Sequence, residues 1–174
     1  MTICMQGREC LLGDIVGDKM QYSEAGDMIC AEWEALPQRF PTVELDEWIV
    51  MPNHLHGIIV MVDSIRATLM DTSNQAGINP ASTSKHILGD VVGAFKSIST
   101  NQYIDGVHNK GWLPFFKKLW QRNYHEHIVR NERELEAIRK YIYNNPKQWM
   151  LDRDHPNNML PKSIDDYLHD AGIL

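Results

Sequence analysis

The stretch VELDEWIVMPNHLHGIIVMV, residues 43–62, decides the fold that this chain is predicted to adopt. Residues 43–51 are rich in β-branched and aromatic side chains, and the dipeptide Pro52-Asn53 that follows them is a turn signal. A second apolar run occupies residues 54–62. Two strand-like runs joined by so short a turn predict a β-hairpin.

Two histidines open the second predicted strand. Because side chains alternate between the faces of a strand, His54 and His56 should project from one face, about 7 Å apart, where both imidazoles can bind one cation. Gly57 beside them is expected to leave space for a substrate backbone. The pair alone is weak evidence, because two surface histidines on a strand are more common than a metal site.

The rest of the chain predicts helices that pack on an antiparallel sheet. The predicted order of elements, β-α-β-β-α-β-α, lacks parallel βαβ alternation, which favours an α+β fold. Residues 64–84 and 106–114 are expected to be loops. The other predicted elements are strands over residues 2–5, over 11–16 (strand or turn) and within 120–130, and helices over 24–36 (capped by Ser23, stopped by Pro37), 86–99 and 132–144 (opened by Asn131 and Glu134, ended by Pro146).

The composition is that of an ordinary globular protein. The length of 174 residues suits one domain, assigned to residues 1–150, followed by an acidic, loop-like tail over residues 151–174. No apolar run reaches the ~18 residues that span a bilayer, and no signal peptide opens the chain, so a cytoplasmic protein is expected. The three cysteines, Cys4, Cys10 and Cys30, lack metal-ligand spacing and are expected to be reduced.

Charge is distributed unevenly along the chain. The formal net charge is −6, with −8 over residues 1–92, +5 over residues 93–147 and −3 over residues 148–174. A phosphate-binding surface requires a local basic patch rather than a basic protein. The middle segment can be such a patch or merely a solvated face, and its charge alone does not decide between them.

The end of the last predicted helix carries a second chemical signal, the sequence YIYNNP at residues 141–146. At 100° per residue, the apolar stripe of this helix centres near about 335°, with Tyr141 at about 240° and Asn145 at about 280°. Tyr143 falls at about 80°, on the opposite flank. One helix face can therefore present a tyrosine nucleophile and an amide-oxygen ligand. The alternative is that Tyr141 only borders the core, and Pro146 disfavours helical geometry at Asn145.

These groups suit phosphoryl transfer. Two imidazoles and an amide oxygen leave positions open for phosphate oxygens and water, which favours Mg²⁺ or Mn²⁺, with Zn²⁺ as an alternative. A phenol with a pKa of about 10 is a weak nucleophile while it is protonated. A cation that polarises the phosphate would offset the developing charge, and Tyr141 would then form a covalent phosphotyrosine.

Three motifs, in the same order along the chain, resemble those of the REP-associated tyrosine transposases, a single-tyrosine HUH family. They are ELDEWIVMPNHLHG at residues 44–57, LWQRNYHEHIVRN at 119–131 and YIYNNP at 141–146. The segment LGDVVGAFKS at residues 88–97 also resembles the middle helix of that family. The likeness covers about residues 2–149, and three ordered motifs are far more specific than a His-x-His pair alone.

The resemblance implies a DNA transposase with a ferredoxin-like antiparallel sheet. It implies that His54, His56 and Asn145 are metal ligands and that Tyr141 is the nucleophile. It further implies single-stranded or hairpin DNA as the substrate, cleaved to a 5′-phosphotyrosine and a free 3′-OH. Family members usually extend further before the segment that begins at Thr2, so the sequence leaves the assembly open, with a homodimer as one possibility.

Aromatic and basic residues interleave between residues 110 and 122, a pattern that suits single-stranded DNA but also a core strand with a charged rim. Within the likeness to the family, the roles of Glu126 and His127 stay open, and a structural His–Glu pair is favoured over a catalytic one. The candidate DNA-binding residues are Lys96, Lys117, Lys118, Arg122 and Arg130.

Two other functions stay open at this stage. A His-x-His metal phosphoesterase that acts on small substrates would not need Tyr141. A domesticated, inactive protein that only binds DNA hairpins would need none of the chemistry, although His54, His56, Tyr141 and Asn145 are all present.

Overall fold

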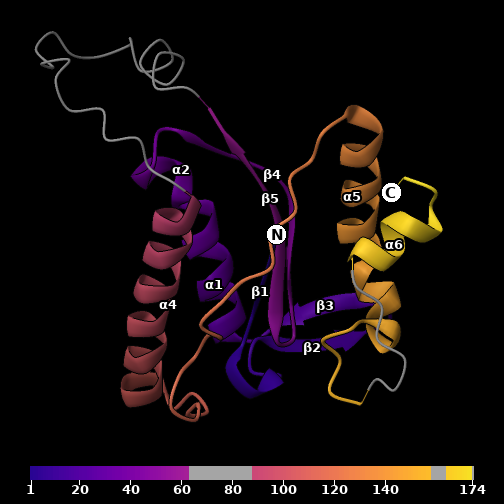
Figure 1. The fold of residues 1–174 in the computed structure, drawn as a ribbon. Helices are drawn as coiled ribbons and strands as arrows, with labels where there is room; N and C mark the ends of the chain where they lie inside the picture. Colours follow the sequence, from indigo (N-terminus) through magenta and orange to yellow (C-terminus); the bar gives the residue numbers. More distant parts are fainter. Residues whose placement is uncertain (63–87, 158–163, 174) are drawn as a thin grey trace, which may run out of the picture.

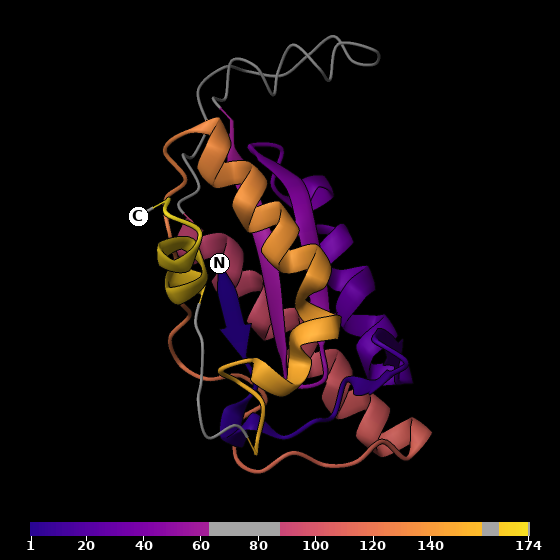
Figure 2. The same ribbon diagram turned by 90° about the vertical axis from the view of Figure 1, so that its right-hand side faces the viewer.

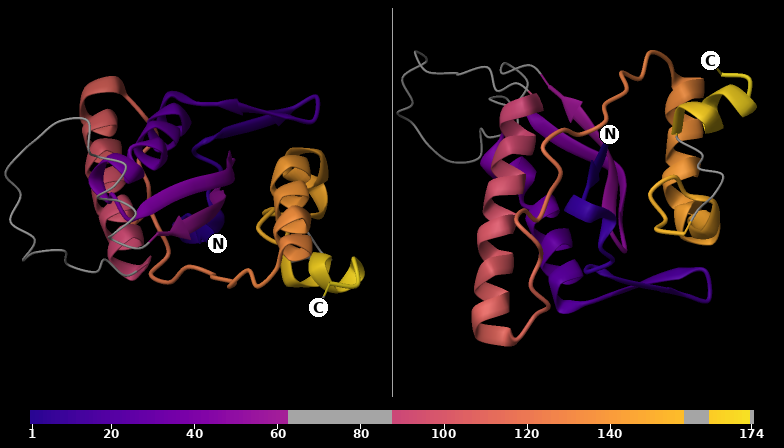
Figure 3. Two further views of the ribbon diagram at one scale, coloured as in Figure 1. Left: turned by 90° about the horizontal axis from the view of Figure 1, so that it is seen from above. Right: turned by 60° about the horizontal axis from the view of Figure 1, so that its bottom comes forward.

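An antiparallel sheet lies between two layers of helices (Figure 1). On one side lie α1 (Glu24–Glu34) and α4 (Leu88–Lys110), and on the other lies α5 (Glu132–Asn144), with α6 (Ile164–Asp170) packed beside it (Figure 3). The predicted α+β class, with an antiparallel sheet and helices packed on it, is confirmed.

The computed structural model describes residues 1–62, 88–157 and 164–173. The loop predicted over residues 64–84 lies outside these ranges. Within them, the three cysteines are free, as predicted, and no helix combines the length and apolar character needed to cross a membrane.

The main sheet has the strand order β1-β5-β4, and both neighbouring pairs are antiparallel. The predicted hairpin is confirmed as β4 (Val43–Met51) and β5 (His54–Met61). The short strand β1 (Thr2–Cys4) pairs with the other edge of β5, opposite His54 to His56. The two histidines therefore lie in the central strand, where neighbours on both sides hold the backbone in place.

A second hairpin of β2 (Gly13–Val16) and β3 (Lys19–Tyr22) stands apart from the main sheet. The first of these strands was predicted as strand or turn, and the second was not predicted. The turn between them has Gly17 and Asp18 at positive φ, 56° and 62°, the backbone geometry that tight hairpins favour. The hairpin reaches below the end of α5 (Figure 1), where β3 contacts the 3-10 helix η2 (Asn145–Leu151).

The strand predicted within residues 120–130 is wrong as a regular strand. The segment is extended beside β1, but only isolated bridges join it to the sheet, between Thr2 and His125 and between Met5 and Trp120. The reason is the length of its partner, because β1 is three residues long and cannot support a continuous ladder. The segment still matters, because it forms one wall of the candidate site.

The helix predicted over residues 86–99 continues to Lys110, so the loop predicted from Gly106 is wrong up to that point. Gly106 lies within the helix, where its lack of a side chain makes room for the Trp112 ring. A Cβ at this position would come within 2.2 Å of Cε3 of Trp112. The helix ends instead before Gly111, whose φ of 72° is typical of a C-terminal glycine.

Prolines lie at the start of short helices rather than only at the ends of long ones. α1 ends at Glu34, and Pro37 lies in the first turn of α2 (Leu36–Arg39), where its missing N–H costs no hydrogen bond. Pro146 has the same position in η2, directly after α5. The predicted helix ends are therefore nearly correct, but the chain continues to coil beyond them.

The C-terminal tail was predicted to be loop-like, but it contains the helix α6. Ile164 and Leu168, four residues apart, are both buried and give this helix an apolar stripe. They join Ile58, Ile138 and Ile142 in a core between the sheet and α5, while a larger core fills the space between the sheet and the α1–α4 layer. The smaller core holds the candidate site.

Candidate active site

His54 and His56 stand at the start of β5, on the face that α5 and η2 cover (Figure 2). Their placement on one face was predicted from strand alternation and is confirmed. Both side chains are buried, and their Nε2 atoms lie 2.9 Å apart. Two ring nitrogens this close can both bind the same proton or cation.

Gly57 does not serve the purpose predicted for it. A Cβ at this residue would lie 2.5 Å from Cζ2 of Trp33, a fully buried residue of α1. Gly57 therefore faces the opposite side of the sheet from the histidines, as the strand alternation requires. Its small size admits the Trp33 ring to the core and does not make space for a substrate.

Asn53 determines which nitrogen of His54 carries the proton. Its Nδ2 donates to the carbonyl oxygens of Arg8 and Asp154, at 3.0 and 2.8 Å, and these two bonds fix the orientation of the amide. Its Oδ1 therefore faces Nδ1 of His54, at 2.9 Å, and because an amide oxygen only accepts, Nδ1 must donate. Nε2 of His54 is left unprotonated, the form in which imidazole binds a metal ion.

His56 is oriented by Thr2, whose Oγ1 lies 2.8 Å from its Nδ1. The register of β1 places Thr2 directly opposite His56. Burial, followed by the charge of His56, lowers the pKa of His54 to about 3, so His54 is neutral near pH 7. Two facing ring nitrogens at 2.9 Å would repel each other with nothing between them, so a shared proton or a cation must lie between the rings.

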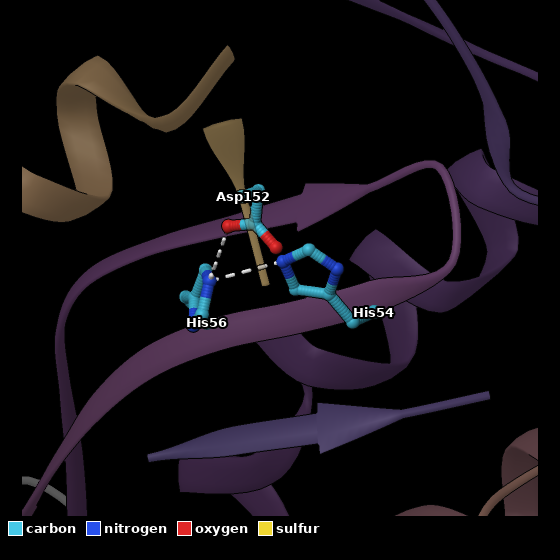
Figure 4. A group of neighbouring side chains, drawn as sticks. All are labelled: His54, His56 and Asp152. Atoms are coloured by element: carbon cyan, nitrogen blue, oxygen red, sulfur yellow. Dashed lines mark hydrogen bonds and ion pairs between the residues drawn. The ribbon is translucent and has the colours of Figure 1, made fainter. Parts of the chain in front are cut away.

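Asp152, just after η2, completes a group of three (Figure 4). Its Oδ2 lies 3.8 Å from Nε2 of His56, and one ligand atom from each of the three side chains lies within 4.8 Å of the others. Burial alone would raise the pKa of Asp152, but hydrogen bonding to His56 and the charges of both histidines hold it well below its usual value. The site therefore contains a buried carboxylate in its charged form.

Asp152 was not predicted as a site residue. It lies in the tail that was predicted to be a loop, and a lone Asp there carries no motif. The group of three combines two imidazoles with one carboxylate, a ligand set that fits a divalent cation.

Tyr141 packs against this group from α5. Its ring centroid lies 5.2 Å from that of His56, and only 6% of the residue is exposed, whereas Tyr143 is 69% exposed. The helical-phase prediction that Tyr141 and Tyr143 lie on different faces is confirmed. Burial, followed by the charge of Asp152, raises the pKa of Tyr141 far above its usual value, so the phenol is protonated.

Asn145 also lies at the site, on the predicted face. Its Nδ2 donates to Oδ2 of Asp152 at 3.2 Å, and it lies within hydrogen-bonding reach of the Tyr141 phenol. Its Oδ1 is buried and has no hydrogen-bond partner among the described residues. A buried amide oxygen without a partner is costly, and a cation beside Asp152 would satisfy it.

A cavity of about 230 Å³ opens beside these residues. His56, Tyr141 and Asp152 line its inner end, and the segment from Gln121 to His125 forms one wall. Tyr141, the candidate nucleophile, is therefore buried but lines a cavity that opens beside the site.

The predicted DNA-binding residues fall into two groups. Lys117, Lys118, Arg122 and Lys96 line a second cavity of about 410 Å³ between α4 and the segment after it, and Gln121 lines both cavities. The Lys96 ammonium is already occupied, since it donates to three backbone carbonyls, those of Gln121 (2.8 Å), Arg122 (3.3 Å) and Asn123 (3.1 Å). Of the five, Arg130 alone lines neither of these two cavities.

His127 forms a structural pair, but its partner is Glu134 rather than Glu126. Its Nε2 lies 2.6 Å from Oε1 of Glu134, and its Nδ1 lies 3.4 Å from Asp165 of α6. Since both ring nitrogens face carboxylates, which only accept, the pair links the start of α5 to α6. The motif that contains His127 therefore stabilises the packing of α5 and α6 beside the site.

The chain was compared with protein-family models and with known proteins. No family model matches the sequence. Over 157 residues the chain is 34% identical to an uncharacterized protein of Haemophilus influenzae, a match that covers 88% of this chain and 82% of that protein.

Among solved structures, a REP-associated tyrosine transposase bound to a REP hairpin has a similar fold, with a TM-score of 0.52 and 19% sequence identity. The match covers 85% of this chain and 65% of the transposase chain, so this chain spans just under two thirds of that length.

Proposed function

The chain belongs to the same family as the uncharacterized Haemophilus influenzae protein, and we propose that it is a metal-dependent, single-tyrosine DNA transposase of the HUH type. The observation that carries this proposal is the position of Tyr141 against His56 and Asp152. Three segments far apart in the sequence bring a phenol, two imidazoles and a carboxylate to one buried site. The transposase fold of the structural neighbour supports the same function.

His54, His56 and Asp152 would hold the metal ion, with the unpartnered Oδ1 of Asn145 beside them. The mixed nitrogen and oxygen set is compatible with Mg²⁺ or Mn²⁺. When bound, the ion would supply the positive charge that polarises a phosphate. The same charge would offset the effect of the Asp152 carboxylate, which raises the pKa of the neighbouring Tyr141 phenol.

Tyr141 would act as the nucleophile. Its Oη attacks the phosphorus of a single-stranded DNA phosphate, a new bond forms between them, and the bond from phosphorus to the 3′ oxygen breaks. The phenolic proton leaves as the new bond forms, and the departing 3′ oxygen takes up a proton, so the step releases no net proton. The products are a 5′-phosphotyrosine and a free 3′-OH. The ester keeps the energy of the broken bond, so the reverse reaction can join a different 3′-OH.

Single-stranded or hairpin DNA would be the substrate. Lys117, Lys118 and Arg122 give the second cavity a basic lining, and the largely exposed Phe116 ring lies 4.9 Å from the Lys117 ammonium. Basic and aromatic side chains together suit a strand with unpaired bases. Lys96 would support this surface by holding the backbone that presents Arg122. The structural neighbour is itself bound to a REP hairpin.

A suicide oligonucleotide tests the nucleophile. In Mg²⁺ or Mn²⁺, the wild type and Tyr143→Phe should form a covalent DNA adduct, and Tyr141→Phe should form none. Tyr143 is a matched control because it lies on the same helix but is 69% exposed. Peptide mapping should place the 5′-phosphate on Tyr141, and an adduct on Tyr143 would contradict the proposal.

The same variants distinguish the two other functions. Phosphoesterase activity on a small substrate that survives in Tyr141→Phe would indicate a metal hydrolase. Hairpin binding without an adduct in the wild type would indicate an inactive binding protein.

A further inference from the structure

Arg8 has an unusual backbone. It is one of three non-glycine residues with positive φ in the described chain, at 57°, and it follows Gly7 at 71°. A left-handed conformation is unfavourable for a non-glycine residue, and such strained residues concentrate at functional sites. The conformation places the Arg8 carbonyl where Asn53 donates to it, at 3.0 Å. The backbone of Arg8 therefore already supports the orientation of His54.

The side chain of Arg8 lines the 230 Å³ cavity together with His56, Tyr141 and Asp152. Its Nε lies 3.4 Å from Oδ1 of Asp154, and 44% of the side chain stays exposed. Asp154 thus holds the guanidinium at the cavity, while other N–H donors of the same group can reach a ligand.

Arg153 brings a second guanidinium to the same cavity. It lies between two buried aspartates in the sequence, Asp152 and Asp154, yet its own side chain is exposed and has no hydrogen bond or ion pair within the described residues. Asp154 already pairs with Arg8, so Arg153 is not needed to neutralise it. Two aspartates and two arginines therefore line the cavity that adjoins the candidate metal group.

We propose that Arg8 and Arg153 form a phosphate subsite, which binds a backbone phosphate of single-stranded DNA next to the one that Tyr141 attacks. The proposal rests on the proposed function and adds to it the residues that position the strand. Without the two guanidinium groups, Asp152 and Asp154 would repel an anionic strand. Guanidinium groups bind phosphate oxygens through paired N–H donors, which fixes the strand as well as attracting it.

The size of the cavity agrees with this ligand. At about 230 Å³ it is smaller than the ~300–1,000 Å³ typical of pockets that enclose a whole small molecule. One phosphate with part of its nucleotide fits such a space, and the rest of the strand can continue along the wall from Gln121 to the basic second cavity.

A binding experiment that does not depend on cleavage tests the subsite. Fluorescein-labelled oligothymidylate is titrated into the full-length Tyr141→Phe protein, at several salt concentrations, with fluorescence anisotropy as the readout. Phosphate contacts are independent of base sequence, so this probe suffices. Adding Arg8→Gln or Arg153→Gln should raise Kd about tenfold. Each change should also reduce the slope of log K against log salt by about 0.7.

Two controls separate a phosphate contact from a structural role. Arg133→Gln removes an exposed guanidinium of α5 that lines neither the cavity beside Tyr141 nor the basic second cavity, and it should leave both Kd and the salt slope unchanged. Arg8→Lys keeps the charge, so it should restore the salt slope while recovering only part of the affinity. If Arg8→Gln fails to fold, Arg153→Gln carries the test, because that side chain has no hydrogen bond or ion pair with the described residues that the substitution could remove.

The outcomes are distinct. Unchanged affinity and slope in both variants, or an equal loss in Arg133→Gln, would overturn the subsite. Lost affinity and slope in the two variants would support it, even if the wild type forms no adduct on Tyr141. In that last case the proposed nucleophile fails while the phosphate subsite stands.

Discussion

At the scale of single residues, Asn53 controls the chemistry of His54. Its amide is held by two backbone carbonyls, so it presents an oxygen, and only an oxygen, to the imidazole. This leaves Nε2 of His54 unprotonated and aimed at Nε2 of His56. A polar partner that fixes the ring orientation of a metal-binding histidine is worth about 10–100-fold in metal affinity.

Asn53→Ala should therefore weaken Mn²⁺ binding by about 10–100-fold, measured by isothermal titration calorimetry. Asn144→Ala is the matched control, since among the described residues the Asn144 side chain bonds only to the Lys140 carbonyl within α5, and it should bind Mn²⁺ like the wild type. Wild-type affinity in Asn53→Ala would show that His54 does not depend on this amide, or does not bind the ion.

At the scale of elements, the start of α5 decides where Tyr141 points. Asn131 caps the helix by accepting from the Glu134 backbone N–H at 2.9 Å, as the spacing predicted. The Glu134 side chain does not return to Asn131 but accepts from the Arg130 backbone N–H and from His127, both at 2.6 Å. Glu134 thus anchors the helix to the segment that precedes it.

Glu134→Gln should lower the free energy of unfolding by about 1.5–3 kcal/mol at neutral pH, the typical contribution of hydrogen bonds to a charged group. The Arg130 N–H, followed by His127, lowers the pKa of Glu134 below 4.5, its ordinary value. The stabilisation is therefore present above about pH 4.5 and is lost as the pH falls through the lower pKa of the folded state.

Denaturant unfolding between pH 7 and pH 3 measures this effect. The advantage of the wild type over Glu134→Gln should shrink as the solution becomes acidic. Glu132→Gln, with a side chain that is 77% exposed, should show no such pH-dependent difference. If the difference in free energy of unfolding between the wild type and Glu134→Gln were constant over this pH range, the charged form of Glu134 could not be its source.

At the scale of the whole molecule, the candidate site is assembled from parts that are remote in sequence. β5 supplies the histidines, α5 supplies Tyr141, and the tail returns to supply Asp152. The boundary predicted at residue 150 stays a prediction, but Asp152 lies beyond it and is buried in the site. A domain of residues 1–150 would therefore need the first residues of the tail to complete its metal group.

Asp152→Asn should abolish the rise in Tm that Mn²⁺ causes in the full-length protein. An ion that binds only the folded state stabilises it by about 2.7 kcal/mol at a concentration of 100 Kd, and the variant lacks the charged ligand. Asp18→Asn, at an exposed turn, keeps its backbone conformation and should show the full rise. A full rise in Asp152→Asn, measured by scanning calorimetry, would remove Asp152 from the metal group.

The sequence by itself determined the features that follow from local periodicity. Alternation along a strand put His54 and His56 on one face, and the 100° step of a helix separated Tyr141 from Tyr143. Both predictions were right because an element's own geometry sets them, whatever packs against it. The hairpin and the cap of α5 were predictable for the same reason.

Only the tertiary structure decided the features that depend on contacts between distant segments. Asp152 carries no local signal, and it becomes part of the site because η2 brings the tail back to His56. Gly57 and Gly106 were misinterpreted because the rings of Trp33 and Trp112, which require their small size, come from other parts of the chain. Packing partners are set by the whole fold, so neither spacing nor propensity along one segment can specify them.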